Sequence, residues 1–204
     1  MTAGTVLVFL KYPEPGRVKT RLAATVGDDR AAELYRDWLT QVLTTLQPLR
    51  PDIAIVGAID GAPAEQFADW RPLVDRWWQQ PAGDLGTRLD AAFREAHETG
   101  APVVAVGTDC LELDAQLVRD AFAILTSHDA VFGPATDGGY YLVGSSRYLD
   151  GFFDGVRWSS PETLSDHTRR CENRGFSHDF LTTLPDIDTW DDWLAYCRRA
   201  GRIP

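Results

Sequence analysis

Short apolar segments alternate along the chain with longer amphipathic segments. The apolar runs predict strands buried in a sheet, at residues 5–10, 53–57, 103–106, 130–133 and 140–143. Apolar residues at helical spacing predict helices over residues 28–46, 84–98, 114–125, 160–174 and 189–199. This alternation is typical of βαβ units, so we predict an α/β fold: a three-layer α/β/α sandwich with a mostly parallel, Rossmann-like sheet. Ligands of such sheets bind at the carboxyl ends of the strands.

The composition narrows the class of protein. A chain of 204 residues predicts a single domain over residues 1–204, and its net charge of −10 argues against binding to nucleic acid or to anionic membranes. No apolar run approaches the ~20 residues of a membrane span, and no signal peptide is apparent. Three scattered cysteines form no disulfide framework, which favours a reducing compartment, so we expect a cytoplasmic protein.

The loop after the first strand concentrates positive charge. Of 20 cationic residues only two are lysines, Lys11 and Lys19, and this loop holds both, together with Arg17 and Arg21. Gly16 permits close approach of the backbone to a ligand, so the loop is a candidate di- or triphosphate site. It is not a P-loop, because no glycine directly precedes Lys19 and the glycine spacing differs. The alternative is a solvated basic loop.

A carboxylate follows the third predicted strand, in the segment 107–110 (Gly-Thr-Asp-Cys). Asp109 is placed to hold Mg²⁺ or Mn²⁺, hard cations that take oxygen ligands beside substrate phosphates. The alternative role for Asp109 is a helix cap or turn. We do not expect Cys110 to act as a nucleophile, because the sequence places no histidine to activate it.

Two further acidic segments are candidates. Asp137, Gly138 and Gly139 separate two strands; they either lie flat against an acceptor or form a plain hairpin turn. Residues 186–192 (Asp-Ile-Asp-Thr-Trp-Asp-Asp) precede the last helix, and the last two aspartates complement its dipole. Either of the other two, Asp186 or Asp188, remains as a second ligand for the ion at Asp109.

These motifs, in this order, resemble one family over residues 5–196. It is the glycosyltransferase-A-like family labelled radical-SAM/selenodomain-associated transferase, within the nucleotide-diphospho-sugar transferase superfamily. The chain also resembles, more distantly, the molybdenum cofactor and phospholactate guanylyltransferases. The motifs that carry the resemblance are residues 11–22, 83–89, 107–110, 133–144, 158–159 and 186–189. The chain departs from the family pattern at Leu111, where proline is usual.

The resemblance implies a nucleotide-activated donor and a divalent metal, Mg²⁺ or Mn²⁺. Asp109 matches the metal-site aspartate and Asp188 a second ligand, while Lys19 and Arg21 match the phosphate-binding loop. We therefore predict Lys19, Arg21 and Asp109 as catalytic. The expected binding residues are Lys11, Gly16, Arg17, Lys19, Arg21, Asp84, Gly86, Asp137, Gly138 and Gly139.

The reaction stays open at this point. A transferase that uses an NDP-sugar or NTP donor is our first hypothesis; a guanylyltransferase-like nucleotidyltransferase that releases pyrophosphate is the second. A non-catalytic nucleotide-binding protein is a third, since a fold alone does not fix a function. The seven tryptophans leave room for a homodimer surface. The sequence identifies neither the nucleobase, nor the sugar, nor the acceptor.

Overall fold

The computed structural model describes residues 2–203. Seven strands within this range form one sheet in the order β3-β2-β1-β4-β6-β5-β7, and β6 alone among them runs antiparallel to its neighbours. The strands are β1 (Gly4–Lys11), β2 (Ile53–Asp60), β3 (Arg76–Gln79), β4 (Val103–Val106), β5 (Ala130–Pro134), β6 (Tyr140–Ser145) and β7 (His178–Phe180).

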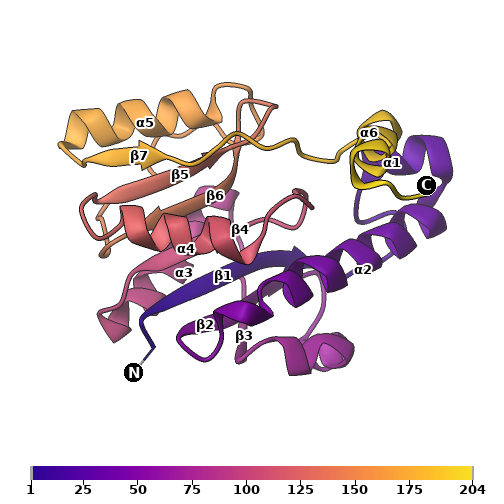
Figure 1. The fold of residues 1–204 in the computed structure, drawn as a ribbon, viewed down its shortest axis with the longest axis horizontal. Coiled ribbons are helices and arrows are strands. Elements are labelled where there is room, and N and C mark those ends of the chain that lie inside the picture. Colours follow the sequence, from indigo (N-terminus) through magenta and orange to yellow (C-terminus); the bar gives the residue numbers. More distant parts are fainter. Residues whose placement is uncertain (1, 204) are drawn as a thin grey trace.

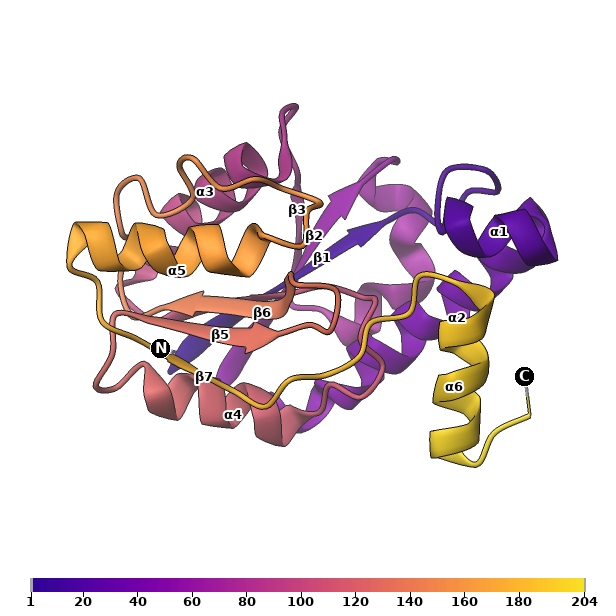
Figure 2. The same ribbon diagram turned by 90° about the horizontal axis from the view of Figure 1, so that it is seen from above.

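Helices cover both faces of the sheet, as Figure 2 shows from above. The α-helices are α1 (Thr20–Val26), α2 (Asp28–Thr45), α3 (Leu85–Ala96), α4 (Ala115–Ile124), α5 (Thr163–Arg174) and α6 (Trp190–Ala200); the 3₁₀ segments are η1 (Gln47–Leu49), η2 (Ala64–Leu73) and η3 (His97–Thr99). Val6, Val8 and Leu10 pack in one core with α2, α4 and α6, whereas Leu7 packs in the other with α3 and α5. The predicted three-layer sandwich with a mostly parallel sheet is confirmed.

Elements with a strong apolar pattern lie where the sequence predicts them. In α2, the positions Leu34, Tyr35, Trp38 and Val42 recur at helical spacing and are all buried, and two aspartates complement the dipole of its first turn. The sequence pattern does not predict β3, β7 or α1, nor the 3₁₀ segments η1 and η2. Helix α5 also begins later than predicted, at Thr163 instead of residue 160.

The order of the strands fixes the position of a ligand site. The chain adds β2 and then β3 on one side of β1, and afterwards crosses to add β4 on the other side (Figure 1). The loops that leave the carboxyl ends of β1 and β4 therefore diverge, and the gap between them is where ligands of open α/β sheets bind. Lys11 ends β1, and Asp109 lies just beyond β4.

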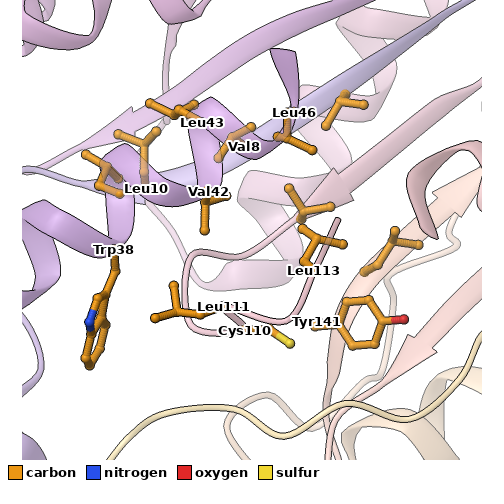
Figure 3. Packing of buried hydrophobic residues seen from close by; sticks show 14 of the residues in the cluster. Val8, Leu10, Trp38, Val42, Leu43, Leu46, Cys110, Leu111, Leu113 and Tyr141 are labelled. Carbon is orange, nitrogen blue, oxygen red and sulfur yellow. The ribbon is translucent and has the colours of Figure 1, made fainter. Parts of the chain in front are cut away.

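Buried side chains anchor the loop that carries Asp109. Cys110, Leu111 and Leu113 are at most 6% exposed, and Figure 3 shows them in one cluster with Trp38 and Val42 of α2. Leu111, which replaces the proline usual in the family pattern, thus holds the loop by apolar packing, and its carbonyl accepts a hydrogen bond from Gln41. Burial raises the pKa of the Cys110 thiol to about 12, so this cysteine is a packing residue and no nucleophile.

No helix in residues 2–203 is both long enough and apolar enough to span a membrane.

Candidate active site

A cleft of about 860 Å³ opens at the carboxyl ends of β1 and β4. Seven of the residues predicted from the sequence line it: Lys11, Arg17, Lys19, Arg21, Asp84, Asp109 and Asp188. They come from the end of β1, the loop and the helix α1 that follow it, the start of α3, the loop after β4 and the loop before α6. Distant stretches of the chain therefore bring cations and carboxylates to one edge of the sheet.

The ammonium of Lys19 is the centre of the charged part of the cleft. Its Nζ lies 2.7 Å from Asp109 Oδ1 and 3.3 Å from Asp188 Oδ1, and it donates a 2.6 Å hydrogen bond to the carbonyl of Ile187. It also lies 5.4 Å from the ring centroid of Trp38. The contacts with Asp188 and Ile187 are hydrogen bonds, and the contact with Asp109 is an ion pair. The Lys19 side chain is only 7% exposed, so its charge is buried and paired.

Local structure holds each partner of Lys19 in place. Lys19 has left-handed backbone angles (φ 47°, ψ 46°) directly before α1, a conformation that is costly outside glycine and is found at functional sites. The carbonyl of Asp109 accepts a 2.9 Å hydrogen bond from the backbone N–H of Ile187. The backbone N–H of Asp188 donates to the carboxylate of Asp192, which also belongs to the capping box of α6. Asp192, in the first turn of α6, therefore positions Asp188 and does not itself line the main cleft.

A buried tyrosine ties together the two loops that form the cleft. The hydroxyl of Tyr35 accepts a 3.1 Å hydrogen bond from the backbone N–H of Lys11, and it lies 3.0 Å from Thr108 Oγ1. Burial, followed by the negative charge of Asp109, raises the pKa of Tyr35 to about 12, so the hydroxyl stays protonated. No sequence pattern marks Tyr35 as functional, because it occupies an ordinary position in the apolar stripe of α2.

Arg88 organises the opposite end of the cleft. Its guanidinium donates to Asp60 (2.8 Å) and to the carbonyl of Gly83 (2.9 Å). Asp84 caps α3 by accepting hydrogen bonds from the backbone and the hydroxyl of Thr87, and these bonds lower the pKa of Asp84. Asp84 therefore has a structural role at the rim of the cleft. The Asp60–Arg88 pair was not predicted.

An aromatic wall, which we define as Tyr140 and Trp158, faces the cleft together with Leu85, which is 42% exposed. Gly86 does not line the cleft; a Cβ there would lie 2.6 Å from Trp158 Nε1, so the absence of a side chain lets the indole approach α3. Behind Tyr140, His167 lies 3.2 Å from the tyrosine hydroxyl. Burial lowers the pKa of His167 to about 3, so this histidine is neutral.

The segment Asp137–Gly139 forms the turn of the β5–β6 hairpin. Asp137 accepts a 2.8 Å hydrogen bond from the backbone N–H of Gly139, and a Cβ on Gly138 would lie 2.2 Å from the carbonyl oxygen of Pro161. Of the two alternatives for residues 137–139, the hairpin turn thus describes the local structure of the segment. Asp137 lines a smaller neighbouring cleft of about 260 Å³, and none of the three lines the main one. Gly16, with φ 74° beside Asp28, also lies outside the main cleft.

Asp186 and Asp188 have different surroundings. Asp188 shares the Lys19 ammonium with Asp109, whereas Asp186 accepts a 3.2 Å hydrogen bond from Thr136 and lines the smaller cleft. Burial, then the charge of Asp137, raises the pKa of Asp186. Of the two, Asp188 is therefore the carboxylate that lies with Asp109.

The donor set of Asp109 and Asp188 suits a hard divalent cation. Both are carboxylates, and Mg²⁺ typically takes one or two carboxylates and completes its shell with substrate phosphates and water. Over residues 2–203, no group of three or more His, Cys, Asp or Glu side chains is placed to hold a metal ion. The pair fits an ion that is shared with a ligand and does not fit a cage built by the protein alone.

Comparison with known proteins agrees with this architecture. A family model described as "Uncharacterized protein conserved in bacteria (DUF2064)" matches residues 20–160. A crystal structure from Desulfovibrio desulfuricans, of a protein described provisionally as a nucleotide-diphospho-sugar transferase, is 33% identical; the match covers 98% of this chain and 88% of that one, with a TM-score of 0.89. No protein among the curated ones matches the chain.

Two more distant structures share the fold. CMP:2-keto-3-deoxy-manno-octonic acid synthetase in complex with CTP is 10% identical, with a TM-score of 0.61 and 98% of each chain covered. A mannosyltransferase from Pyrobaculum calidifontis in complex with GDP-Man and Mn²⁺ is 14% identical, with a TM-score of 0.59; the match covers 98% of this chain and 61% of that one.

Proposed function

We propose that this chain, which belongs to the DUF2064 family, is a metal-dependent transferase that uses a nucleotide-activated donor, an NDP-sugar or an NTP. The observation that carries the proposal is the joint position of Lys19, Asp109 and Asp188 in the cleft at the carboxyl edge of the sheet. The 33% identity to the Desulfovibrio desulfuricans protein supports the nucleotide-diphospho-sugar transferase superfamily. The radical-SAM/selenodomain-associated subfamily is part of the proposal.

The exposed cations of the cleft bind the phosphates of the donor in this proposal. The side chains of Lys11, Arg17 and Arg21 are 57%, 77% and 76% exposed, and each pairs with one carboxylate. Ion pairs this exposed contribute little free energy, so the three side chains can exchange them for a ligand phosphate. Their local positive charge outweighs the net charge of −10 at short range, because salt screens distant charges beyond roughly 8 Å. Catalysis then rests on positioning and on neutralising the charge of the leaving phosphate.

Asp109 and Asp188 are the residues that hold the divalent ion in this proposal. When bound, the ion acts as a Lewis acid that neutralises charge on the phosphate oxygens. The structures of the mannosyltransferase with GDP-Man and Mn²⁺ and of the synthetase with CTP share the fold, which makes both sugar and nucleotide donors reasonable candidates.

The remaining residues of the cleft divide between the donor and the acceptor. The Asp60–Arg88 pair and the segment from Gly83 to Gly86 lie near the ends of β2 and β3, and we assign the nucleobase to that end. We assign the acceptor to the side of the β5–β6 hairpin, where Asp137 lies. An acceptor there approaches a donor phosphate held near Asp188, which lines both clefts.

Binding and product analysis together test the proposal. A thermal-shift screen of nucleotides and nucleotide sugars with Mn²⁺ identifies the donor, because a ligand that binds the native state raises its melting temperature. Phosphorus NMR of the products then separates the reactions: glycosyl transfer releases a nucleoside diphosphate, and nucleotidyl transfer releases pyrophosphate from an NTP. Lack of a shift with every nucleotide and nucleotide sugar would contradict the proposal; binding without turnover across a broad acceptor panel would favour a non-catalytic nucleotide-binding protein.

A further inference from the structure

The most unusual feature of the cleft is that a lysine ammonium already lies between the two carboxylates assigned to the ion. Asp109 and Asp188 both contact Lys19 Nζ, and their own side chains are 52% and 35% exposed, so they border the cleft while the ammonium lies beneath them. The ammonium donates hydrogen bonds to Asp188 and to the carbonyl of Ile187, and it forms a 2.7 Å ion pair with Asp109. In this position its charge is directed at the two carboxylates and not at a phosphate.

We infer that Lys19 is the resting occupant of the cation site, and that a divalent ion displaces its ammonium towards the phosphate-binding part of the cleft. This inference rests on the proposed function, because it concerns the same two carboxylates. Lys19 is thus a positioning residue while the site is empty of ions, since it holds Asp109 and Asp188 together. It becomes a phosphate ligand only after an ion has taken its place.

Electrostatics gives the reason for the exchange. With the ammonium between them, the two carboxylates keep an excess of one negative charge, which the exposed Arg21 at 3.1 Å from Asp188 reduces. A divalent ion neutralises both carboxylates, and it repels the neighbouring ammonium because both are positive. The lysine stem is flexible, and Lys19 already lines the cleft, so the displaced ammonium has a path to the phosphates.

The chemistry of the residue type supports this role. Lysine presents a compact charge on a stem with several rotatable bonds, whereas arginine binds carboxylates with a rigid fork. All other cationic positions except Lys11 are arginines in this chain, including those in its surface ion pairs. An arginine at position 19 would form a rigid bidentate pair with a carboxylate, and such a pair would oppose displacement by an ion. The lysine at this position forms no bidentate pair and is easier to displace.

The scarcity of lysine provides a direct test. In the full chain labelled with ¹³C at the lysine Cε carbons, NMR gives signals from Lys11 and Lys19 only, and a Lys11→Arg variant assigns them. We expect titration with Mg²⁺, without nucleotide, to shift the Lys19 signal towards that of an exposed, mobile lysine. The Lys11 signal, from a side chain that is 57% exposed and 4.0 Å from Asp60, should stay in place and serves as an internal control.

A second measurement uses a variant without the ammonium. Lys19→Met retains a side chain of similar length, and we expect it to bind Mn²⁺ at least about tenfold more tightly than the parent in the absence of nucleotide, because a nearby positive charge is gone. Electron paramagnetic resonance of free Mn²⁺ measures this affinity. Arg21→Met is the matched control: its guanidinium also contacts Asp188 but is 76% exposed, so we expect less than about a threefold change.

The outcomes separate this inference from the proposed function. If Mg²⁺ binds and the Lys19 signal does not move, or if Lys19→Met binds Mn²⁺ no better than the parent, the exchange is wrong although a metal-dependent transferase remains. If the exchange occurs but no nucleotide binds, the proposed function is wrong and the exchange stands. If neither the parent nor Lys19→Met binds Mn²⁺ without nucleotide, the exchange is wrong; the metal part of the proposed function fails only if Mn²⁺ also does not bind when the nucleotide is present.

Discussion

Lys19 Nζ lies 2.7 Å from Asp109 Oδ1, across the gap between the loops that leave β1 and β4. Lys19 follows β1, and Asp109 follows β4, the strand that pairs with β1 on the side opposite β2. The contact therefore joins the two loops across the point where the strand order reverses. Because Asp188 joins the same ammonium from the loop before α6, three distant segments meet at one point.

Asp109→Ala should abolish the part of nucleotide binding that depends on the ion. The substitution removes one of two carboxylates that border the cleft, and Mg²⁺ bound by few protein ligands does not tolerate the loss of one of them. Asp191→Ala is the control, since Asp191 lies in the first turn of α6 and complements its dipole. Calorimetry with Mg²⁺ and the identified nucleotide measures both. Equal affinities of Asp109→Ala and the parent would refute the metal assignment.

Tyr35→Phe should lower the free energy of unfolding by about 1–3 kcal/mol, because the backbone N–H of Lys11 and the hydroxyl of Thr108 lose their buried partner. Urea unfolding measures the cost. The looser connection between the β1 and β4 loops should also weaken nucleotide binding. Tyr196→Phe is the control: its hydroxyl accepts a hydrogen bond from Gln41 away from the cleft, so a similar loss of stability should leave nucleotide affinity unchanged. A parallel loss of affinity in both variants would contradict the role given to Tyr35.

The extent to which the sequence predicts this fold depends on how each element is stabilised. Elements β1 and β4 are buried on both faces and show continuous apolar runs, so their positions follow from the sequence. Strand β3, with the sequence Arg-Trp-Trp-Gln, lies at the sheet edge and is half-exposed, and β7 spans three residues, so neither has a distinctive pattern. Helix α1 has no side-chain cap and no acidic first turn, which removes the usual signals of a helix start.

The candidate site, like the fold, is only partly predictable from the sequence. The rule that loops at the carboxyl ends of parallel strands form the site brings Lys11, Lys19 and Asp109 to one edge, as predicted. It does not give the partners that each side chain selects in three dimensions. The pairing of Lys19 with two carboxylates, and of Arg88 with Asp60, depends on rotamers and on packing between segments that the sequence pattern does not encode.

Gly86→Ala should displace Trp158, because the new Cβ would lie 2.6 Å from the indole nitrogen. We expect a loss of stability of about 1–3 kcal/mol from overpacking, together with weaker binding of any ligand that contacts the aromatic wall. A double-mutant cycle with Trp158→Ala checks the cause: once the indole is removed, the same Gly86→Ala change should cost little or nothing. Urea unfolding of the four proteins measures the coupling, and additive effects would show that the indole is not what the Cβ meets.

Acid should destabilise the protein partly through two histidines, His167, which is buried, and His97, which is half-buried. Burial lowers the pKa of His97 to about 4 and of His167 to about 3, whereas the unfolded chain titrates near 6.5. The unfolded state therefore binds more protons below pH 6.5, and stability falls as the pH is lowered from 7 towards 4. His167→Gln should reduce the slope of the unfolding free energy against pH between pH 7 and 5, by an amount that corresponds to at most one proton. Urea unfolding at each pH measures this slope. An unchanged slope would mean that His167 is not held neutral in the native state.

Arg88→Lys should weaken nucleotide binding by about tenfold while it costs only about 1 kcal/mol of stability, because lysine lacks the fork that joins the carboxylate of Asp60 to the carbonyl of Gly83. The segment at the start of α3 would then be held less firmly against the ends of β2 and β3, where we place the nucleobase. Arg94→Lys is the matched control on the same helix: Arg94 pairs with Asp90 and Tyr148 and is 63% exposed. Calorimetry with the nucleotide and urea unfolding separate the two effects. Of the two arginines, only Arg88 lines the cleft. If Arg88→Lys and Arg94→Lys bind the nucleotide equally well, the nucleobase therefore lies elsewhere in the cleft.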